Sequence, residues 1–197
     1  KSILSYGDIS IISFHSTKLF HTIEGGALVI PDDHLFEKAS RMINFGFVGP
    51  SRIIELGINA KMNEFQAAMG LCVLDDIDDI FQKRKEKFEF YMKHLGEIAG
   101  VRIPSHNPSC SRNYGYFPVL FDSESIVMSV IRELAKYDIH PRRYFHPSLE
   151  SLDYVSPQTM VVSSDIANRI LCLPMFAELE ESHQLQIIEV IRRMVSP

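Results

Sequence analysis

The chain of 197 residues is long enough for one large domain or two small ones, with 46% hydrophobic and 23% charged residues, as in ordinary globular proteins. Its formal net charge of −5 argues against a nucleic acid as main partner, because proteins that bind a phosphate backbone present basic surfaces. The apolar runs are shorter than the roughly 18 residues of a membrane span, and no signal-peptide pattern is visible. We therefore expect small molecules or other proteins as partners, with no membrane and no nucleic acid.

The three cysteines, Cys72, Cys110 and Cys172, lie far apart and form no CxxC pair. Cys72 and Cys172 stand in apolar runs, where a thiol is expected to behave as a small core side chain. This usage favours a reducing cytoplasm. The eight histidines lack the close ligand spacing of zinc motifs, so we expect no metal site.

The first predicted elements are two short strands. Residues 9–14 (ISIISF) are rich in β-branched side chains, and residues 25–30 (GGALVI) are almost continuously apolar, so both patterns indicate buried strands. Lys18 stands on the connection between them. An amine beside a buried sheet edge is partly desolvated, which favours its neutral form and makes it a nucleophile towards carbonyl groups.

A helix is predicted next, because residues 34–46 carry apolar side chains at helical spacing after an aspartate cap and end at Gly46. Residues 47–61 contain two glycines and a proline without a sustained period, which suggests an irregular loop. The longest helical pattern follows, from Asn63 to Gly96. Asn63 and Gln66 have the spacing of a capping box, and an apolar face is traced by Phe65, Met69, Cys72, Leu74, Ile77 and Phe81.

Beyond Gly100 the pattern alternates. Two strand-like segments, residues 101–104 and 112–122, precede a helix from about residue 124 to 137, and an amphipathic helix covers about residues 180–195. This order is typical of an α+β module. We place the boundary between the two parts of the chain within the long helix, giving domains 1–85 and 86–197.

Two motifs resemble one known family. SFHSTK followed by EGGALV (residues 13–18 and 24–29) resembles the lysine loop of the DegT/StrS family of sugar-nucleotide aminotransferases, which depend on pyridoxal 5'-phosphate. GINAKMNEFQAAMG (residues 57–70) resembles the second signature of that family. Further likeness lies in RMINFG (residues 41–46) and IHPRRYFHP (residues 139–147).

The resemblance implies an α/β and α+β fold, the C-terminal part of a fold-type I pyridoxal-phosphate transferase: the end of the large domain and the small domain. The sequence, which begins with a lysine, then reads as a piece of a longer protein. We expect these 197 residues alone to be inactive, because the residues that stack on the cofactor and pair with its ring nitrogen belong upstream.

The resemblance also implies the roles of individual residues. Lys18 binds the cofactor covalently and moves protons, Ser13 hydrogen-bonds its phosphate, and Asn59 reaches the phosphate in the neighbouring subunit of a homodimer. From the residues alone, Ser13 could equally bond its own backbone at a strand end, and Asn59 could be a turn residue.

Other residues are candidates for substrate contacts. His15 either lines the sugar site or stacks on a neighbouring strand. Lys61 replaces an arginine common in the family and loses the bidentate fork of that side chain. Arg142, Arg143 and Tyr144 form a possible anion-binding cluster for a nucleotide pyrophosphate, although a solvated loop explains the arginines nearly as well.

The function implied is transamination of a nucleotide-linked keto-deoxysugar for surface polysaccharide, lipopolysaccharide or glycoside synthesis, with glutamate as the amino donor. Lys18 favours transamination, because the dehydratases of this family have histidine there. The alternative is a non-enzymatic remnant or partner-binding module that retains the fold.

Overall fold

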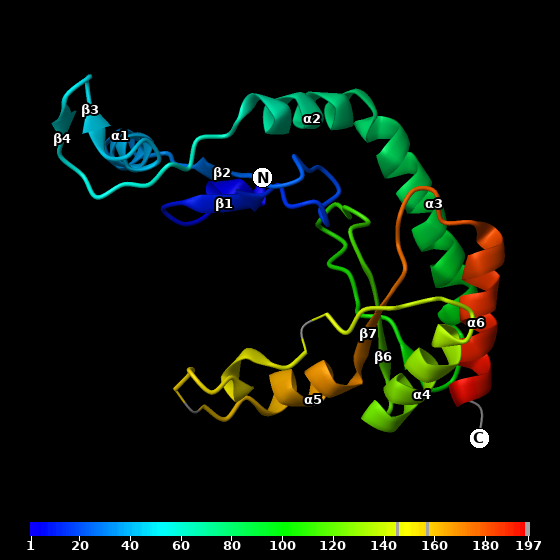
Figure 1. The fold of residues 1–197 in the computed structure, drawn as a ribbon. Coiled ribbons are helices and arrows are strands. Elements are labelled where there is room, and N and C mark those ends of the chain that lie inside the picture. The colour runs from blue at the N-terminus through cyan, green and yellow to red at the C-terminus, as the bar shows by residue number, and fades with distance from the viewer. Residues whose placement is uncertain (145, 157, 196–197) are drawn as a thin grey trace. The chain divides into compact units, whose positions relative to one another are not determined.

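A computed structural model describes residues 1–144, 146–156 and 158–195, and Figure 1 shows its ribbon. The chain divides into two compact units, residues 1–78 and residues 79–197. The assignment of domains 1–85 and 86–197 within a larger enzyme stays a prediction. Among the described residues, no helix has the length and apolar character needed to cross a membrane.

The first unit opens with a short 3-10 helix, Ile3–Ser5, and an antiparallel hairpin. Strand β1, Ser10–Ser13, pairs with β2, Gly26–Val29, in a register that places Ser13 opposite Gly26. Both predicted strands are confirmed, but their predicted burial is wrong, since Ile11 is 79% exposed and Leu28 46% exposed. A ladder of two strands covers neither of its own faces, so the apolar side chains remain accessible.

Helix α1, Asp33–Met42, begins where Asp32 accepts a hydrogen bond from the Leu35 backbone N–H at 2.8 Å. The segment after α1 is more regular than the predicted loop, because β3, Phe47–Val48, and β4, Arg52–Ile53, form a small hairpin. Glycine is required at position 46, where φ is +77° and a Cβ atom would lie 1.9 Å from the carbonyl oxygen of Glu55.

The predicted long helix is two helices, α2, Glu64–Asp75, and α3, Ile77–Leu95. The chain leaves helical geometry at Asp76, with φ −102° and ψ 2°. The four aspartates at positions 75, 76, 78 and 79 explain the break, because aspartate is a poor helix former and like charges three or four residues apart repel. The predicted capping box of Asn63 and Gln66 is confirmed.

The predicted apolar face of α2 is not buried. Phe65 is 88% exposed and Leu74 51% exposed, and within α2 only Gly70 and Val73 are buried. Cys72 is also exposed, so the prediction that it is a core side chain is wrong for the described structure. A helical period identifies a face, but what covers the face must come from elsewhere in the fold.

The second unit contains a three-stranded antiparallel sheet in the order β5-β6-β7, with strands Val101–Arg102, Phe117–Phe121 and Ile170–Leu173. Its helices besides α3 are α4, Glu124–Ala135, α5, Val161–Arg169, α6, Glu181–Val195, and the 3-10 turn Leu149–Ser151. Figure 1 shows α6 alongside α3 and the paired strands β6 and β7. The sequence predicted β5, β6, α4 and α6 but missed α5 and β7.

The core of the chain lies in the second unit. Fully buried side chains from α3, β6, α4, β7 and α6 meet there, among them Tyr91, Phe117, Leu134, Leu171 and Ile191. Two polar groups inside it form hydrogen bonds: the Tyr91 hydroxyl donates to the Pro174 carbonyl at 3.2 Å, and Gln184 Nε2 donates to the Lys87 carbonyl at 2.9 Å. The latter bond joins α6 to α3.

Candidate functional site

Lys18 lies on the connection between β1 and β2, residues 14–25. Two backbone hydrogen bonds extend the hairpin beyond the strands: Phe14 N–H donates to the Gly25 carbonyl and Thr22 N–H donates to the Phe14 carbonyl, each at 2.9 Å. The Lys18 side chain is exposed. The expected desolvation of its amine is therefore wrong for the residues described, because neither strand beside it is buried.

The base of this loop packs on α2. Thr22 is only 2% exposed, and a Cβ atom at Gly70 of α2 would lie 2.9 Å from its methyl carbon and 3.4 Å from the Phe20 ring. The Phe20 and Phe14 rings meet edge to face, with centroids 4.9 Å apart. Lys18 thus stands on an exposed turn whose stem is held by buried contacts.

The loop also approaches the second motif. A Cβ atom at Gly25 would lie 2.3 Å from Thr22 Oγ1 and 3.1 Å from the terminal methyl carbon of Met62. Since Met62 follows Asn59 by three residues, the structure brings the segment of the second motif against the stem of the Lys18 loop. Both motifs belong to the first unit.

Ser13 ends β1 and is exposed. Its hydroxyl oxygen accepts a hydrogen bond from the His15 backbone N–H at 3.3 Å. The local role expected of a strand-end serine is therefore present, and because an oxygen that accepts keeps its own O–H, the side chain can still donate.

Asn59 lies on a return segment that pairs with the end of α1. It forms an isolated antiparallel bridge with Asn44, and the next residue donates its backbone N–H to the Ile43 carbonyl at 2.9 Å. Lys61 Nζ donates to Asn59 Oδ1 at 2.7 Å and lies 4.5 Å from the Phe45 ring centroid. Because Oδ1 is engaged by a cation, the exposed amide presents its N–H donors.

Arg142 and Tyr144 belong to the second unit. The Arg142 backbone pairs with Cys172 of β7, with N–O distances of 3.0 and 2.9 Å, and its guanidinium carbon lies 5.8 Å from the Tyr144 ring centroid. The exposed side chain of Arg142 is thus placed beside an aromatic ring. Tyr144 also contacts Tyr116, with ring centroids 5.0 Å apart.

The Arg143 side chain contacts groups of two helices. Its Nη2 lies 2.9 Å from Glu124 Oε1 and its side chain is only 18% exposed. The same nitrogen donates to the Asn168 carbonyl at 3.2 Å. This mostly buried guanidinium joins α4 to α5, and its part in an anion-binding cluster stays a prediction.

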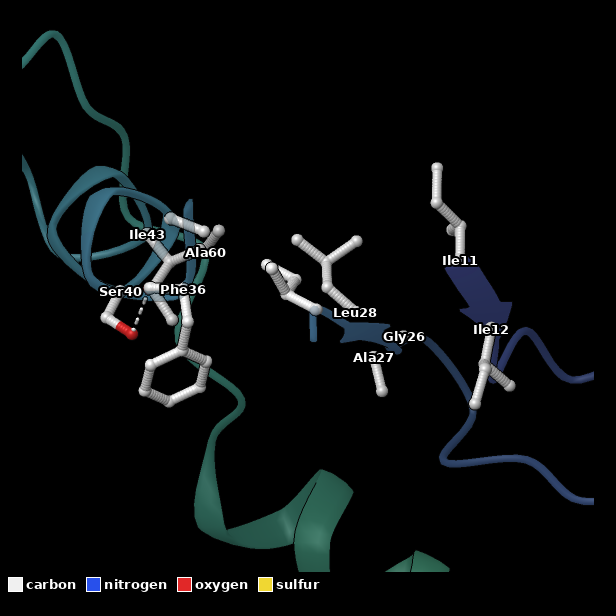
Figure 2. A pocket seen from close by; sticks show the side chains of 11 residues that line it. Ile11, Ile12, Gly26, Ala27, Leu28, Phe36, Ser40, Ile43 and Ala60 are labelled. Carbon is white, nitrogen blue, oxygen red and sulfur yellow. Dashed lines mark hydrogen bonds between the residues drawn. The ribbon is translucent and has the colours of Figure 1, made fainter. Parts of the chain in front are cut away.

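An apolar groove of about 450 Å³ lies between the hairpin and α1. Figure 2 shows Phe36 and Ser40 of α1, together with Ile43 that follows this helix, on one side and Ile12 and Leu28 of the hairpin on the other. The single polar side chain in its lining, that of Ser40, donates to the Phe36 carbonyl at 2.8 Å. The groove presents an apolar packing surface and carries no group for catalysis.

The model of the DegT/DnrJ/EryC1/StrS aminotransferase family matches residues 1–192. The chain belongs to this family. The fold class expected from the resemblance, the C-terminal part of an α/β and α+β transferase, is confirmed, because solved aminotransferases of the family match this chain over about half of their own length.

Individual relatives agree with this membership. A dTDP-4-amino-4,6-dideoxy-D-glucose transaminase from Shigella dysenteriae is 35% identical over 98% of this chain and 54% of the relative. The solved structure of DesI with its TDP-sugar product is 30% identical, has a TM-score of 0.85, and is matched over 95% of this chain and 49% of DesI. The chain therefore spans about half the length of these relatives.

A more distant structure shows the fold alone. The aminotransferase TlmJ from Streptoalloteichus hindustanus superposes with a TM-score of 0.87 at 23% identity, over 96% of this chain and 52% of TlmJ.

The structure adds contacts that the sequence did not reveal. Lys61 Nζ bonds Asn59 Oδ1. The hydroxyl of Thr17 hydrogen-bonds the His15 ring, and a carboxylate oxygen of Glu24 lies 3.5 Å from His15 Nε2. The spacing of His15 and Thr17 could have indicated a side-chain turn, because a side-chain acceptor two residues before a backbone N–H forms such turns. No comparable signal in the sequence connects Glu24 with His15.

Proposed function

We propose that the whole protein is an aminotransferase that depends on pyridoxal 5'-phosphate and transfers an amino group, with glutamate as donor, to a keto-deoxysugar linked to a nucleotide. The observation that carries this proposal is a family lysine, Lys18, exposed on the β1–β2 loop of a chain whose family match covers residues 1–192. The names of the relatives, a dTDP-sugar transaminase and a GDP-perosamine synthase from Vibrio cholerae among them, support the substrate class.

The donor set of the first unit fits this cofactor. Lys18 offers an accessible amine for the aldehyde, and Ser13 and the Asn59 amide offer neutral donors suited to a phosphate dianion. Pyridoxal phosphate, when bound, supplies the electron sink that amino-group transfer needs.

Each residue then has a definite task. Were the cofactor bound, Lys18 Nζ would be the amine that holds its aldehyde group covalently and, when free, the group that moves a proton at the carbon that carries the amino group. Ser13 orients the phosphate through its hydroxyl. We assign Asn59 to the phosphate in a second copy of the chain, which makes the protein a symmetric homodimer with sites shared across the interface.

The nucleotide-sugar contacts are assigned to Lys61, Arg142 and Tyr144. Lys61 and Arg142 are exposed cations, and the Tyr144 ring lies beside the Arg142 guanidinium. The product would enter surface polysaccharide, lipopolysaccharide or glycoside synthesis. We place the reaction in the cytoplasm, where the three free thiols would remain reduced.

The test is Lys18→Ala in the whole protein, with Lys38→Ala on the exposed surface of α1 as the matched control. We expect Lys18→Ala to lower transaminase turnover by roughly 1,000-fold or more and to remove the cofactor mass from the Lys18 peptide after borohydride reduction. Lys38→Ala should keep both the turnover and the cofactor mass on the Lys18 peptide. Unchanged turnover in Lys18→Ala would refute the assignment, and absence of turnover and cofactor in the unaltered protein would favour a non-enzymatic remnant.

A further inference from the structure

His15 joins the two sides of the Lys18 loop through its ring. Nδ1 lies 2.9 Å from Thr17 Oγ1 and 3.2 Å from the Thr17 backbone nitrogen, and Nε2 lies 3.5 Å from Glu24 Oε1. A backbone N–H can only donate, so Nδ1 accepts and carries no proton. The hydrogen of the neutral ring is therefore on Nε2, where it faces the carboxylate.

The backbone of His15 holds the next peptide group. Its carbonyl accepts a hydrogen bond from the Lys18 N–H at 2.9 Å, while its ring accepts from the Thr17 N–H. His15 thus fixes the peptide groups that precede Thr17 and Lys18. Because a peptide group is planar and includes the following Cα atom, these bonds define the position of the Lys18 Cα.

Glu24 connects the ring to the buried stem of the loop. The Glu24 N–H donates to the Thr22 carbonyl at 2.9 Å, and Thr22 Oγ1 donates back to the Glu24 carbonyl at 2.8 Å. Thr22 is itself buried against α2. A continuous set of contacts therefore runs from the Lys18 turn through His15, Glu24 and Thr22 to α2.

We propose that His15 is a positioning residue that directs the Lys18 amine, with both ring nitrogens used inside the loop and neither left for the sugar. This inference rests on the proposed function and differs from the expectation that His15 lines the sugar site. The bonds from Nδ1 carry most of the effect, because the Glu24 carboxylate is 68% exposed and its contact is long, so solvent screens that interaction.

The chain itself indicates which substitution should preserve this geometry. Asn107 Oδ1 accepts from the Ser109 N–H at 2.9 Å, and Asn113 Oδ1 accepts from the Gly115 N–H at 3.0 Å. Both bonds have the two-residue spacing of His15 and Thr17. Asparagine carries its oxygen where histidine carries Nδ1, so it can retain the bond to Thr17 while losing the contact with Glu24.

The experiment uses the whole enzyme with His15→Leu, which lacks both contacts, His15→Asn, which retains one, and His34→Asn on exposed α1 as control. Steady-state kinetics give kcat and KM for the nucleotide sugar. Nitrogen NMR of histidine-labelled protein gives the ring tautomer, with the His15 signal assigned by its loss in His15→Asn.

We expect His15→Leu to lower kcat by about 10-fold to 100-fold with KM nearly unchanged, since small displacements of a catalytic group are costly. His15→Asn should recover most of the loss, His34→Asn should match the wild type, and the His15 ring should carry its proton on Nε2. Wild-type kcat in His15→Leu, a raised KM with kcat unchanged, or a proton on Nδ1 would each overturn the proposal. Failure of the proposed function would instead appear as retained turnover in Lys18→Ala.

Discussion

The two units of this chain differ in how they bury apolar side chains. In residues 79–197, buried side chains from three helices and a three-stranded sheet form one continuous core. In residues 1–78, all of which the structure describes, Val73 is the single hydrophobic side chain that is buried. The first unit nevertheless carries Lys18, Ser13 and Asn59, and its apolar residues line an open groove.

This difference shows that a unit can have regular backbone structure without being stable on its own. The first unit has capped helices, paired hairpins and a loop held by hydrogen bonds, yet backbone bonds contribute little net free energy without buried apolar area. The other residues of this unit leave faces of β1, β2, α1 and α2 exposed. Contacts that covered these faces would also order the Lys18 loop.

The largest expected effect comes from separating the units. Residues 77–197, which keep α3 intact, should unfold in one cooperative thermal transition, because they contain the core of the chain. Residues 1–76 should show no cooperative transition by circular dichroism or calorimetry.

A core variant serves as the control for this comparison. Leu134 is fully buried, so Leu134→Asp should abolish the transition of residues 77–197. A cooperative transition in residues 1–76 would contradict the contrast between the units.

A second prediction compares one thiol from each unit. Burial raises the pKa of Cys172 from its ordinary value of 9.0 to about 11, and Cys172 is 3% exposed, whereas Cys72 is exposed. In a Cys110→Ser background at pH 8, Cys72 should react with iodoacetamide at least about 100-fold faster, because the thiolate is the nucleophile. Peptide mass spectrometry identifies the labelled site. Comparable rates for Cys72 and Cys172 would show that the thiol in β7 is accessible to solvent.

The Cys172 shift also predicts a pH dependence of stability. The folded-state pKa lies above the unfolded one, so the folded state binds this proton more tightly, and its contribution is complete below about pH 9. The contribution should be lost as the pH rises from 9.0 to about 11. Cys172→Ala should reduce this loss in urea unfolding measured across that range, and an unchanged pH profile would argue against the shift.

Much of the local structure was predictable from short sequence signals. Asn63 with Gln66, and Asp32 before α1, identify helix starts because these side chains accept from nearby backbone N–H groups. The β-branched residues 9–14 and the apolar run of residues 25–30 also located both strands of the first hairpin. Burial was predicted poorly, because an apolar run that contains Ile11 or Leu28 does not show whether anything packs on the strand.

The same limit holds for the candidate site, where the sequence predicted contiguous segments but not the contacts between their side chains. The lysine loop and the Asn59 segment follow from two motifs, since each is contiguous in the sequence. Two contacts were not predicted, that of Lys61 with Asn59 and that of His15 with Glu24. Each depends on how the residues between the two partners fold. The break at Asp76 and the strand β7 were missed because the charge cluster and the short apolar run compete with stronger neighbouring patterns.

The smallest predicted effect concerns helix caps in the two units. Asn63 Oδ1 accepts from the Gln66 N–H at 2.9 Å, and Gln66 Oε1 accepts from the Asn63 N–H at 3.1 Å. The cap of α4 is weaker, with 3.4 Å between Ser123 Oγ and the Ile126 nitrogen, and α4 is also fixed by buried side chains. Asn63→Ala should therefore destabilise the start of α2 by about 1 kcal/mol, which hydrogen exchange would detect as roughly fivefold faster exchange at the Gln66 amide.

Two variants serve as controls for this prediction. Ser123→Ala should change exchange at Ile126 less, and Asn63→Asp should retain the cap. An effect at Ile126 as large as that at Gln66 would show that burial does not protect a helix start, against the contrast drawn between the two units.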